Sequence, residues 1–164
     1  MNIVIHSNPE GILSIKLPYM DGEGDGENAI CDLRSRLCIQ PLGPHPMVKV
    51  LAGELHDYLR GVRAQFSHYP LVWDGITGFE KKVLLGLGDV PYGRTASYGE
   101  LAGRIGFPGA ARAVGQALKR NPWPVLIPCH RVIGKQGALR GFSSGCGWKR
   151  ILLRIEKALK EVPG

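Results

Sequence analysis

One short segment of the sequence carries the residues best suited to covalent chemistry. Cys129 follows Pro128 and precedes His130 and Arg131. A thiol flanked by a histidine and an arginine can be stabilised as the thiolate, which is the reactive form of cysteine. Three prolines within residues 122–128 favour a stiff, extended, strand-like path up to this thiol. Cys129 is therefore a candidate nucleophile, and the alternative is an inert buried cysteine, as most lone cysteines are.

His130 is the nearest candidate base for this thiol. Neighbouring side chains on an extended chain point in different directions, so we expect His130 to act on Cys129 through a water molecule. Such a base needs a third group to orient it. Glu156, on the last predicted helix, is the natural candidate, and the alternative is an exposed partner for Lys157 or Lys160.

A helix-turn-helix is predicted just before the cysteine segment. The spacing of apolar residues predicts helices at 97–105 and 110–120, joined by a turn that contains two glycines. Small residues surround Arg112 on the second helix: Ala110, Ala111, Ala113 and Gly115. They would let the backbone approach a flat partner while Arg112 projects into a groove, with Lys119 and Arg120 at phosphates. The alternative is an alanine-rich helix packed tightly in a small bundle.

The elements that must position these residues fall into two parts. Alternating apolar residues predict a β-hairpin at 3–5 and 12–17 and a further strand at 37–42. Helical spacing predicts a helix at 46–61, followed by a connection over 62–77 with glycine and proline breakers. Capping boxes at Thr77–Glu80 and Ser97–Glu100 predict two helix starts, and the last helix is predicted at 149–160. We therefore predict two domains, residues 1–77 and 78–164.

The distribution of charge separates the same two parts. Residues 1–77 carry six Lys/Arg and nine Asp/Glu, a balance of −3, whereas residues 78–164 carry fifteen and five, a balance of +10. A basic half suggests either a surface that binds a polyanion or simply a solvated basic surface. The sequence has no apolar run of membrane-spanning length and no recognisable secretory signal, so we expect a cytoplasmic or nuclear protein without membrane association.

Other candidate sites in the first half are weak. Cys31 and Cys38 lack a Cys-x-x-Cys spacing, and whether they form a disulfide is left open. The acidic, glycine-rich stretch 21–27 lacks the terminal Glu of a calcium loop, so we interpret it as a solvated turn. No zinc site is expected, because no four-ligand spacing connects the candidate ligands Cys31, Cys38, His6, His45, His56 and His68.

Taken together, several segments resemble the O6-alkylguanine-DNA alkyltransferase family over roughly residues 78–157. Ile127-Pro-Cys-His-Arg-Val132 resembles the active-site motif of that family. The other similar segments are Ser97-Tyr98 at the helix-turn-helix, Ala111-Arg-Ala-Val-Gly115 on the recognition helix, Asn121-Pro122 at the hinge, Gly141-Phe-Ser-Ser144 in the active-site loop, and Glu156.

This resemblance implies a fold and an activity. The fold would be α/β (α+β), with a small ribonuclease-H-like N-terminal domain around a three-stranded sheet and a mainly helical C-terminal domain. The activity would be a single irreversible transfer of an alkyl group from O6-alkylguanine, and also from O4-alkylthymine, to Cys129. The partner would be double-stranded DNA entered through the minor groove, and the protein would be a monomer without a cofactor or an obligate protein partner.

The resemblance also implies roles for single residues. Cys129 is the nucleophile, His130 the water-mediated base, Glu156 the group that orients it, Tyr98 the proton donor to guanine, and Asn121 a hinge. Arg112 would fill the gap left by a flipped nucleotide. The remaining DNA contacts would come from Ser97, Ala111, Ala113, Gly115, Lys119 and Arg120, and the guanine would meet Val132, Phe142 and Ser143. The family often has Tyr where this chain has Phe142, so the hydrogen bond of that hydroxyl is absent.

Three functions remain distinct at this point. The first is the repair protein that consumes its own cysteine. The second is a non-catalytic relative that only binds the lesion, although such relatives lack the cysteine that this chain has. The third is a cysteine hydrolase using Cys129, His130 and Glu156 as a triad, which would turn over and would not need the basic half.

Overall fold

The first third of the chain forms a three-stranded sheet covered by a helix in a computed structural model, which describes residues 1–20, 26–139 and 141–158. Strands β1 (Asn2–Asn8) and β2 (Gly11–Lys16) form an antiparallel hairpin, and β3 (Cys38–Leu42) pairs with β1 in parallel, giving the order β2-β1-β3. The carboxamide of Asn8 caps the hairpin turn by accepting from the backbone N–H groups of Glu10 and Gly11. The hairpin and the third strand are confirmed.

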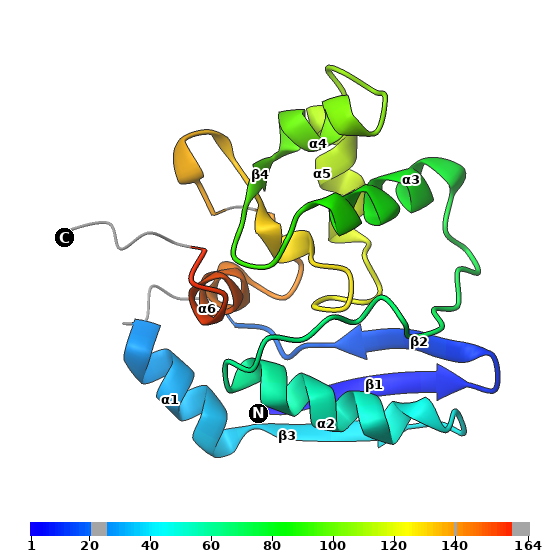
Figure 1. Ribbon diagram of the computed structural model, residues 1–164, viewed down its shortest axis with the longest axis vertical. Helices are drawn as coiled ribbons and strands as arrows, with labels where there is room; N and C mark the ends of the chain where they lie inside the picture. The colour runs from blue at the N-terminus through cyan, green and yellow to red at the C-terminus, as the bar shows by residue number, and fades with distance from the viewer. Residues whose placement is uncertain (21–25, 140, 159–164) are drawn as a thin grey trace.

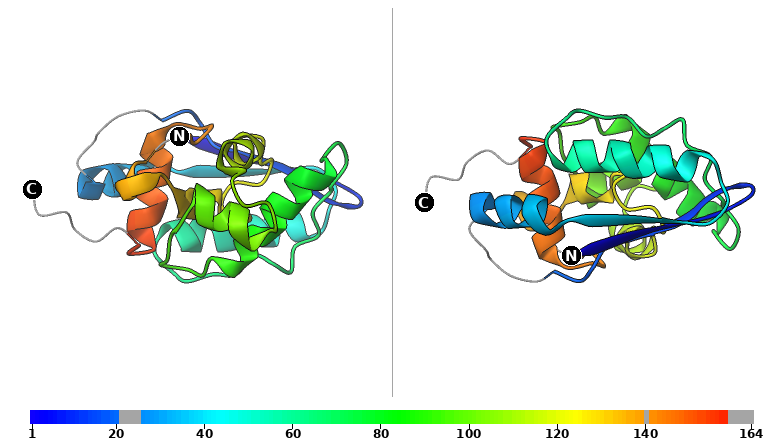
Figure 2. Two further views of the ribbon diagram at one scale, coloured as in Figure 1. Left: turned by 90° about the horizontal axis from the view of Figure 1, so that it is seen from above. Right: turned by 90° about the horizontal axis from the view of Figure 1, so that it is seen from below.

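Two helices belong to this sheet. Helix α2 (Met47–Leu59) confirms the predicted helix and buries Val48, Leu51, Leu55, Tyr58 and Leu59. It lies along the sheet in Figures 1 and 2. Helix α1 (Gly26–Arg36) is not among the predicted helices. Of its side chains whose burial is described, Leu33 is buried and Ala29 and Ile30 are half-buried against the core, so the apolar pattern that marks a helix is short. Of the loop interpreted at 21–27, residues 21–25 lie outside the described residues, and residues 26 and 27 begin α1.

The second half is mainly helical, as predicted. Its elements are α3 (Gly78–Gly86), η1 (Leu87–Asp89), β4 (Ala96–Ser97), α4 (Tyr98–Arg104), α5 (Ala111–Lys119), η2 (Cys129–Arg131), β5 (Val132–Ile133), η3 (Lys135–Gly137) and α6 (Cys146–Ile155). Both capping boxes are present: the Thr77 and Ser97 side chains accept from the backbone N–H groups of Glu80 and Glu100. Helix α6 begins three residues earlier than predicted and ends at Ile155, so Glu156 is its C-cap residue.

The path before Cys129 differs from its prediction. Residues 122–128 form no strand: the Ile127 N–H donates to the Trp123 carbonyl, and Val125 between them has φ 77°. Cys129 itself begins a turn of 3-10 helix. Prolines do exclude α-helix here, but they restrict φ equally well to turn conformations, and the buried side chains of Trp123, Val125 and Ile127 favour the compact path.

The two halves share one buried cluster of apolar side chains. The β2 edge is covered by the segment that follows α5: the Ile15 N–H donates to the Pro122 carbonyl at 2.8 Å, and Trp123 Nε1 donates to the Ile12 carbonyl at 2.8 Å. Figure 1 shows β2 as the edge nearest the helices of the second half. The cysteine segment therefore rests directly on the sheet.

A second contact between the two halves, called the seam below, joins residues 18–20 to the start of α6. Trp148 Nε1 donates to the Pro18 carbonyl at 2.6 Å, and the Gly147 N–H donates to the Met20 carbonyl at 3.1 Å. A Cβ atom added to Gly145 would lie 2.0 Å from the Met20 carbonyl oxygen. Only glycine fits so close to that backbone. None of the helices within the described ranges is long and apolar enough to span a membrane.

Candidate active site and nucleic-acid interface

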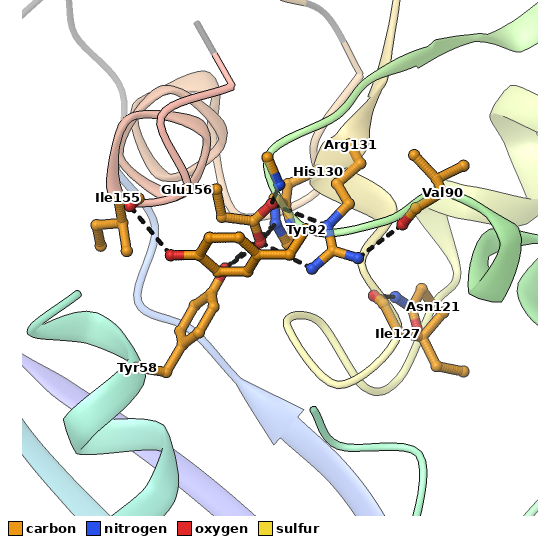
Figure 3. A network of polar contacts seen from close by, with 10 residues as sticks. Tyr58, Val90, Tyr92, Asn121, Ile127, His130, Arg131, Ile155 and Glu156 are labelled. Atoms are coloured by element: carbon orange, nitrogen blue, oxygen red, sulfur yellow. Dashed lines mark hydrogen bonds and ion pairs between the residues drawn. The ribbon is translucent and has the colours of Figure 1, made fainter. Parts of the chain in front are cut away.

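A buried carboxylate, Glu156, is the centre of the polar network in Figure 3. His130 Nε2 lies 2.8 Å from its Oε1, and Arg131 donates from Nε to Oε2 at 2.9 Å and from Nη2 to Oε1 at 3.0 Å. The Tyr58 hydroxyl donates to Oε1 at 2.5 Å, and the Gly93 N–H to Oε2 at 3.2 Å. The predicted pairing of Glu156 with His130 is present, and the alternative of an exposed Glu156 is wrong, because 2% of its surface is exposed.

The network fixes the charge on Glu156 and the proton on His130. Burial alone would raise the pKa of Glu156, but hydrogen bonds from His130 and Arg131 outweigh it and lower the pKa to about 2. Burial lowers the pKa of His130 despite the neighbouring carboxylate. A neutral His130 that donates from Nε2 to Glu156 has its lone pair on Nδ1, and Nδ1 is buried without a hydrogen-bond partner among the described residues. His130 therefore presents an acceptor nitrogen away from Glu156.

Cys129 is a buried thiol, with 6% of its surface exposed. Burial raises its pKa, while a hydrogen bond with the Asn121 side chain and the charge of Lys149 act in the opposite direction. The sequence interpretation that His130 and Arg131 both stabilise the thiolate is not what the structure shows. Arg131 instead points to Glu156 and to the Val90 carbonyl, 2.7 Å from Nη1, because a buried carboxylate requires that cation more than a neutral thiol does.

Lys149 is a functional candidate that sequence reasoning missed. It is 1% exposed, its Nζ lies 5.7 Å from the centroid of the Tyr98 ring, and burial lowers its pKa to about 8, while the charges of Cys129 and Cys146 oppose this shift. A signal was available, since Lys149 and Glu156 are seven residues apart on the apolar face of α6. The sequence contains no comparable signal for the contact of Tyr58 with Glu156, because the two residues are far apart in the chain. It also contains none for the contact of Arg131 with Glu156, because Cys129 is a nearer partner for Arg131 in the sequence.

Asn121 fixes the turn that precedes Cys129, and Tyr98 lies at the start of α4. Asn121 Nδ2 donates to the Ile127 carbonyl at 3.0 Å, and its Oδ1 accepts from the Trp123 N–H at 3.0 Å, so one side chain closes the turn before Cys129. Tyr98 is the first residue of α4, and two glycines lie next to its side chain. A Cβ atom added to Gly115 would lie 3.6 Å from the Tyr98 ring, and one added to Gly141 would lie 3.3 Å from the Tyr98 hydroxyl. Burial, followed by the charges of Cys129 and Cys146, raises the pKa of Tyr98.

The predicted DNA-reading residues lie on the outer face of α5. Arg112, Ala113 and Lys119 are exposed, whereas Ala111 and Gly115 are half-buried and Ser97 at the start of α4 is half-buried. Arg120 is exposed but already paired, with Nη1 2.7 Å from Glu80 Oε1. That hydrogen bond, together with those from Thr77, lowers the pKa of Glu80 to about 2. The guanidinium of Arg120 therefore ties α5 to α3, and its contact with phosphate stays a prediction.

The predicted guanine-contacting residues differ in burial. Val132 is buried and pairs with Ala96 across β4 and β5, Phe142 is buried, and Ser143 is exposed. Within residues 1–20, 26–139 and 141–158, no group of three or more His, Cys, Asp or Glu residues could hold a metal ion. Cys31 and Cys38 are free, exposed thiols.

Solved structures resemble the whole of this arrangement. The structure of Mycobacterium tuberculosis OGT in complex with DNA matches with a TM-score of 0.70 and 32% identity, over 96% of this chain and 94% of that one. The chain belongs to the O6-methylguanine DNA methyltransferase family. Residues 78–158 match the family model described as the DNA binding domain of 6-O-methylguanine DNA methyltransferase. The family predicted from the sequence is confirmed.

Two further members show how the similarity is distributed. The methylated-DNA–protein-cysteine methyltransferase of Mycobacterium bovis is 52% identical over 82 residues, which is 50% of each chain, so the chain matches about half the length of this curated relative. The O6-methylguanine-DNA methyltransferase of the archaeon Pyrococcus kodakaraensis is 34% identical, with a TM-score of 0.57 over 93% of this chain and 89% of that one. Sequence similarity to the family is therefore strongest in the half that holds the thiol and α5.

Proposed function

We propose that this protein repairs DNA by transferring the alkyl group of O6-alkylguanine in duplex DNA to its own Cys129. One observation carries the proposal: the buried thiol of Cys129 is followed in the chain by a buried His130 that lies 2.8 Å from the carboxylate of Glu156, in the same half that exposes Arg112 among small residues on α5. Membership of the methyltransferase family supports the same reaction.

The chemistry follows from the protonation states. His130 Nδ1 accepts the Cys129 proton through a bridging water, and the resulting imidazolium is stabilised by Glu156. The thiolate sulfur attacks the alkyl carbon in line, the S–C bond forms as the C–O6 bond breaks, and the electron pair leaves on guanine. Tyr98, whose raised pKa keeps it protonated, donates to the departing base. The thioether product has no group that would cleave it, so each molecule reacts once.

DNA recognition belongs to α5. Its exposed Arg112 would enter the minor groove and occupy the space of the flipped nucleotide, while the small residues Ala111, Ala113 and Gly115 let the helix approach the duplex. Lys119, Arg120 and Ser97 would contact phosphates, so binding would be largely independent of sequence and sensitive to salt. The flipped guanine would meet the carbonyl of Val132, the ring of Phe142 and the backbone at Ser143, and O4-alkylthymine would be a second substrate. The protein would act as a monomer, without a cofactor, in the cytoplasm or nucleus.

Duplex DNA carrying radiolabelled O6-methylguanine tests this proposal. Label should move to the protein up to about one equivalent and then stop, and peptide mapping should place it on Cys129. Transfer that survives Cys129→Ala would refute the assignment of the acceptor. Continuing release of free label would indicate a hydrolase, and tight binding without transfer a lesion-binding protein.

The role of Arg112 is tested separately. Arg112→Ala should lose repair of duplex DNA much more than reaction with free O6-benzylguanine, because a free base does not need to be flipped. Equal loss with both substrates would remove the flipping role and leave the cysteine chemistry intact.

A further inference from the structure

The N-terminal half contributes one side chain to the network around Glu156. Tyr58 lies in the last turn of α2 and is 1% exposed. Its ring is held edge-on by Phe66 and Tyr92, at centroid distances of 5.7 and 6.3 Å. Its hydroxyl donates to Glu156 Oε1 at 2.5 Å and lies 3.4 Å from His130 Nε2. Figure 3 shows Tyr58 reaching the carboxylate from α2, opposite the segment that carries His130.

The direction of this hydrogen bond is fixed by charge. Glu156 is ionised, and burial followed by the charge of Glu156 raises the pKa of Tyr58, so the phenol keeps its proton and donates. Tyr58, His130 and Arg131 therefore all donate to Oε1. A carboxylate oxygen offers about two lone-pair positions, so these three donors share its negative charge. Each hydrogen bond to Oε1 is then weaker than it would be without the others.

We infer that Tyr58 is a positioning residue of the alkyl-transfer site, through which the N-terminal half holds Glu156 in place and limits how strongly Glu156 binds protonated His130. This inference rests on the proposed function, because it assigns the regulation of the same base. If Glu156 held the imidazolium too strongly, His130 would stay protonated near neutral pH and could not accept the thiol proton. Tyr58 withdraws part of the carboxylate charge and so keeps His130 ready as a base.

The charged and titratable groups around His130 come from several elements. They are Lys149 from α6 and its C-cap residue Glu156, Arg131 and Cys129 from η2, Tyr58 from α2, and Tyr92 from the segment after η1. Of these, Tyr58 donates to the same oxygen as His130 and bears no charge itself. Removing its hydroxyl therefore changes the carboxylate that His130 contacts without changing the net charge of the site.

Tyr58→Phe tests the inference, with Tyr92→Phe as a matched control. The ring of Tyr92 packs against the ring of Tyr58, but the Tyr92 hydroxyl donates to the Ile155 carbonyl at 3.2 Å and not to the carboxylate of Glu156. Single-turnover transfer rates from O6-methylguanine duplex DNA would be measured across acid and neutral pH. In Tyr58→Phe the acidic limb of the rate–pH profile, where the rate falls as His130 becomes protonated, should move to higher pH by about half to one unit. The reason is that Glu156 then accepts more strongly from His130 and stabilises its protonated form. In Tyr92→Phe the acidic limb should stay at the wild-type position.

A second readout does not depend on DNA. The rate at which iodoacetamide alkylates Cys129, read from its peptide by mass spectrometry, should show the same displacement of the acidic limb. If wild-type protein transfers label and the Tyr58→Phe limb coincides with that of wild type or Tyr92→Phe, the inference is wrong and the proposed function stands. If wild-type protein transfers no label, the proposed function fails, and the iodoacetamide profile alone decides whether Tyr58 tunes His130.

Replacement of Tyr58 with 3-fluorotyrosine keeps the ring and hydroxyl in place, so it covers the case in which Tyr58→Phe does not fold. Fluorine makes the phenol a stronger hydrogen-bond donor, which should move the acidic limb to lower pH, opposite to Tyr58→Phe. A limb that does not move, or that moves to higher pH, would overturn the inference.

Discussion

At the scale of single residues, the candidate site combines the thiol of Cys129 and the imidazole of His130 with the nearby charge of Lys149. Cys129 is buried and its pKa is raised, yet its proposed chemistry requires the thiolate. Lys149 supplies a positive charge close by without exposing the thiol to water, because its own side chain is buried on α6. In the proposed mechanism, transfer of the thiol proton to His130 forms the thiolate even though the pKa of the resting thiol is raised.

Lys149→Met should separate reactivity from stability. Without the lysine charge the pKa of Cys129 rises further, so transfer at neutral pH should slow by about tenfold for each unit of pKa. The folded-state pKa of Lys149 lies below its usual value, so the buried ammonium costs stability at pH 7, and the apolar variant should unfold at a higher temperature. Single-turnover rates and thermal unfolding would measure both effects.

Arg154→Met is the control, since Arg154 is exposed on the same helix and should change neither value appreciably. A Lys149→Met protein that reacts at the wild-type rate would show that the lysine charge does not assist the thiol.

At the scale of elements, the segment between α5 and Cys129 depends on one side chain. Asn121→Ala removes two buried hydrogen bonds and leaves the Ile127 carbonyl and the Trp123 N–H unpaired. We expect a loss of about 2–4 kcal/mol in the free energy of unfolding, measured by urea denaturation. Gln116→Ala, at an exposed position of α5, should change it by less than about 0.5 kcal/mol. Equal stabilities of the two variants would contradict the role of Asn121 as a structural hinge.

The two basic residues at the end of α5 should behave differently toward DNA. Lys119→Ala should reduce the slope of log binding constant against log salt by about one, as expected for a lost phosphate contact. Arg120→Ala should change that slope less and lower stability more, because Oε1 of the buried Glu80 loses its hydrogen bond and ion pair, while Thr77 still donates to Oε2. Filter binding over a salt series and urea denaturation would distinguish the two variants. Identical salt slopes would show that the ion pair with Glu80 does not keep Arg120 from contacting phosphate.

The elements also show which features the sequence could reveal. Capping boxes and the apolar spacing of α2 to α6 are local, so they were predicted with small errors at the ends of α6. The sequence does not predict helix α1, because its apolar stripe is limited to the buried Leu33 and the half-buried Ala29 and Ile30. The strand that the sequence predicts before Cys129 is wrong, because proline fixes only its own φ and packing on β2 decides the path of the chain.

At the scale of the whole molecule, Glu156 links the two halves through Tyr58, His130 and Arg131, and its titration should make stability depend on pH. Its folded-state pKa, about 2, lies below the unfolded value of 4.5. Its contribution is therefore fully present above about pH 4.5 and is lost as pH falls toward 2, at a cost of roughly 3 kcal/mol. Glu80 titrates in the same direction, so part of the acid sensitivity belongs to α3.

Urea denaturation of Glu156→Gln at a series of pH values would measure this contribution. The variant should be less stable than wild type at neutral pH, and the difference should shrink as the pH falls toward 2, because protonation removes the same charge from the wild type. A constant difference at all pH values would mean that Glu156 stabilises the fold by packing and not by its charge.

The seam between residues 18–20 and the start of α6 restricts how this sequence can diverge. Gly145 and Gly147 lie against the Met20 backbone, where an added Cβ would approach its carbonyl oxygen to 2.0 and 2.8 Å. The need for glycine there therefore comes in part from the segment after β2, more than a hundred residues earlier in the chain, and not from the reaction. In relatives whose first half is shortened or rerouted, position 147 should accept alanine or serine, whereas position 145 should stay glycine because its φ of 96° strains any other residue. A chimera that joins such a second half to this first half should not form the Met20 contact.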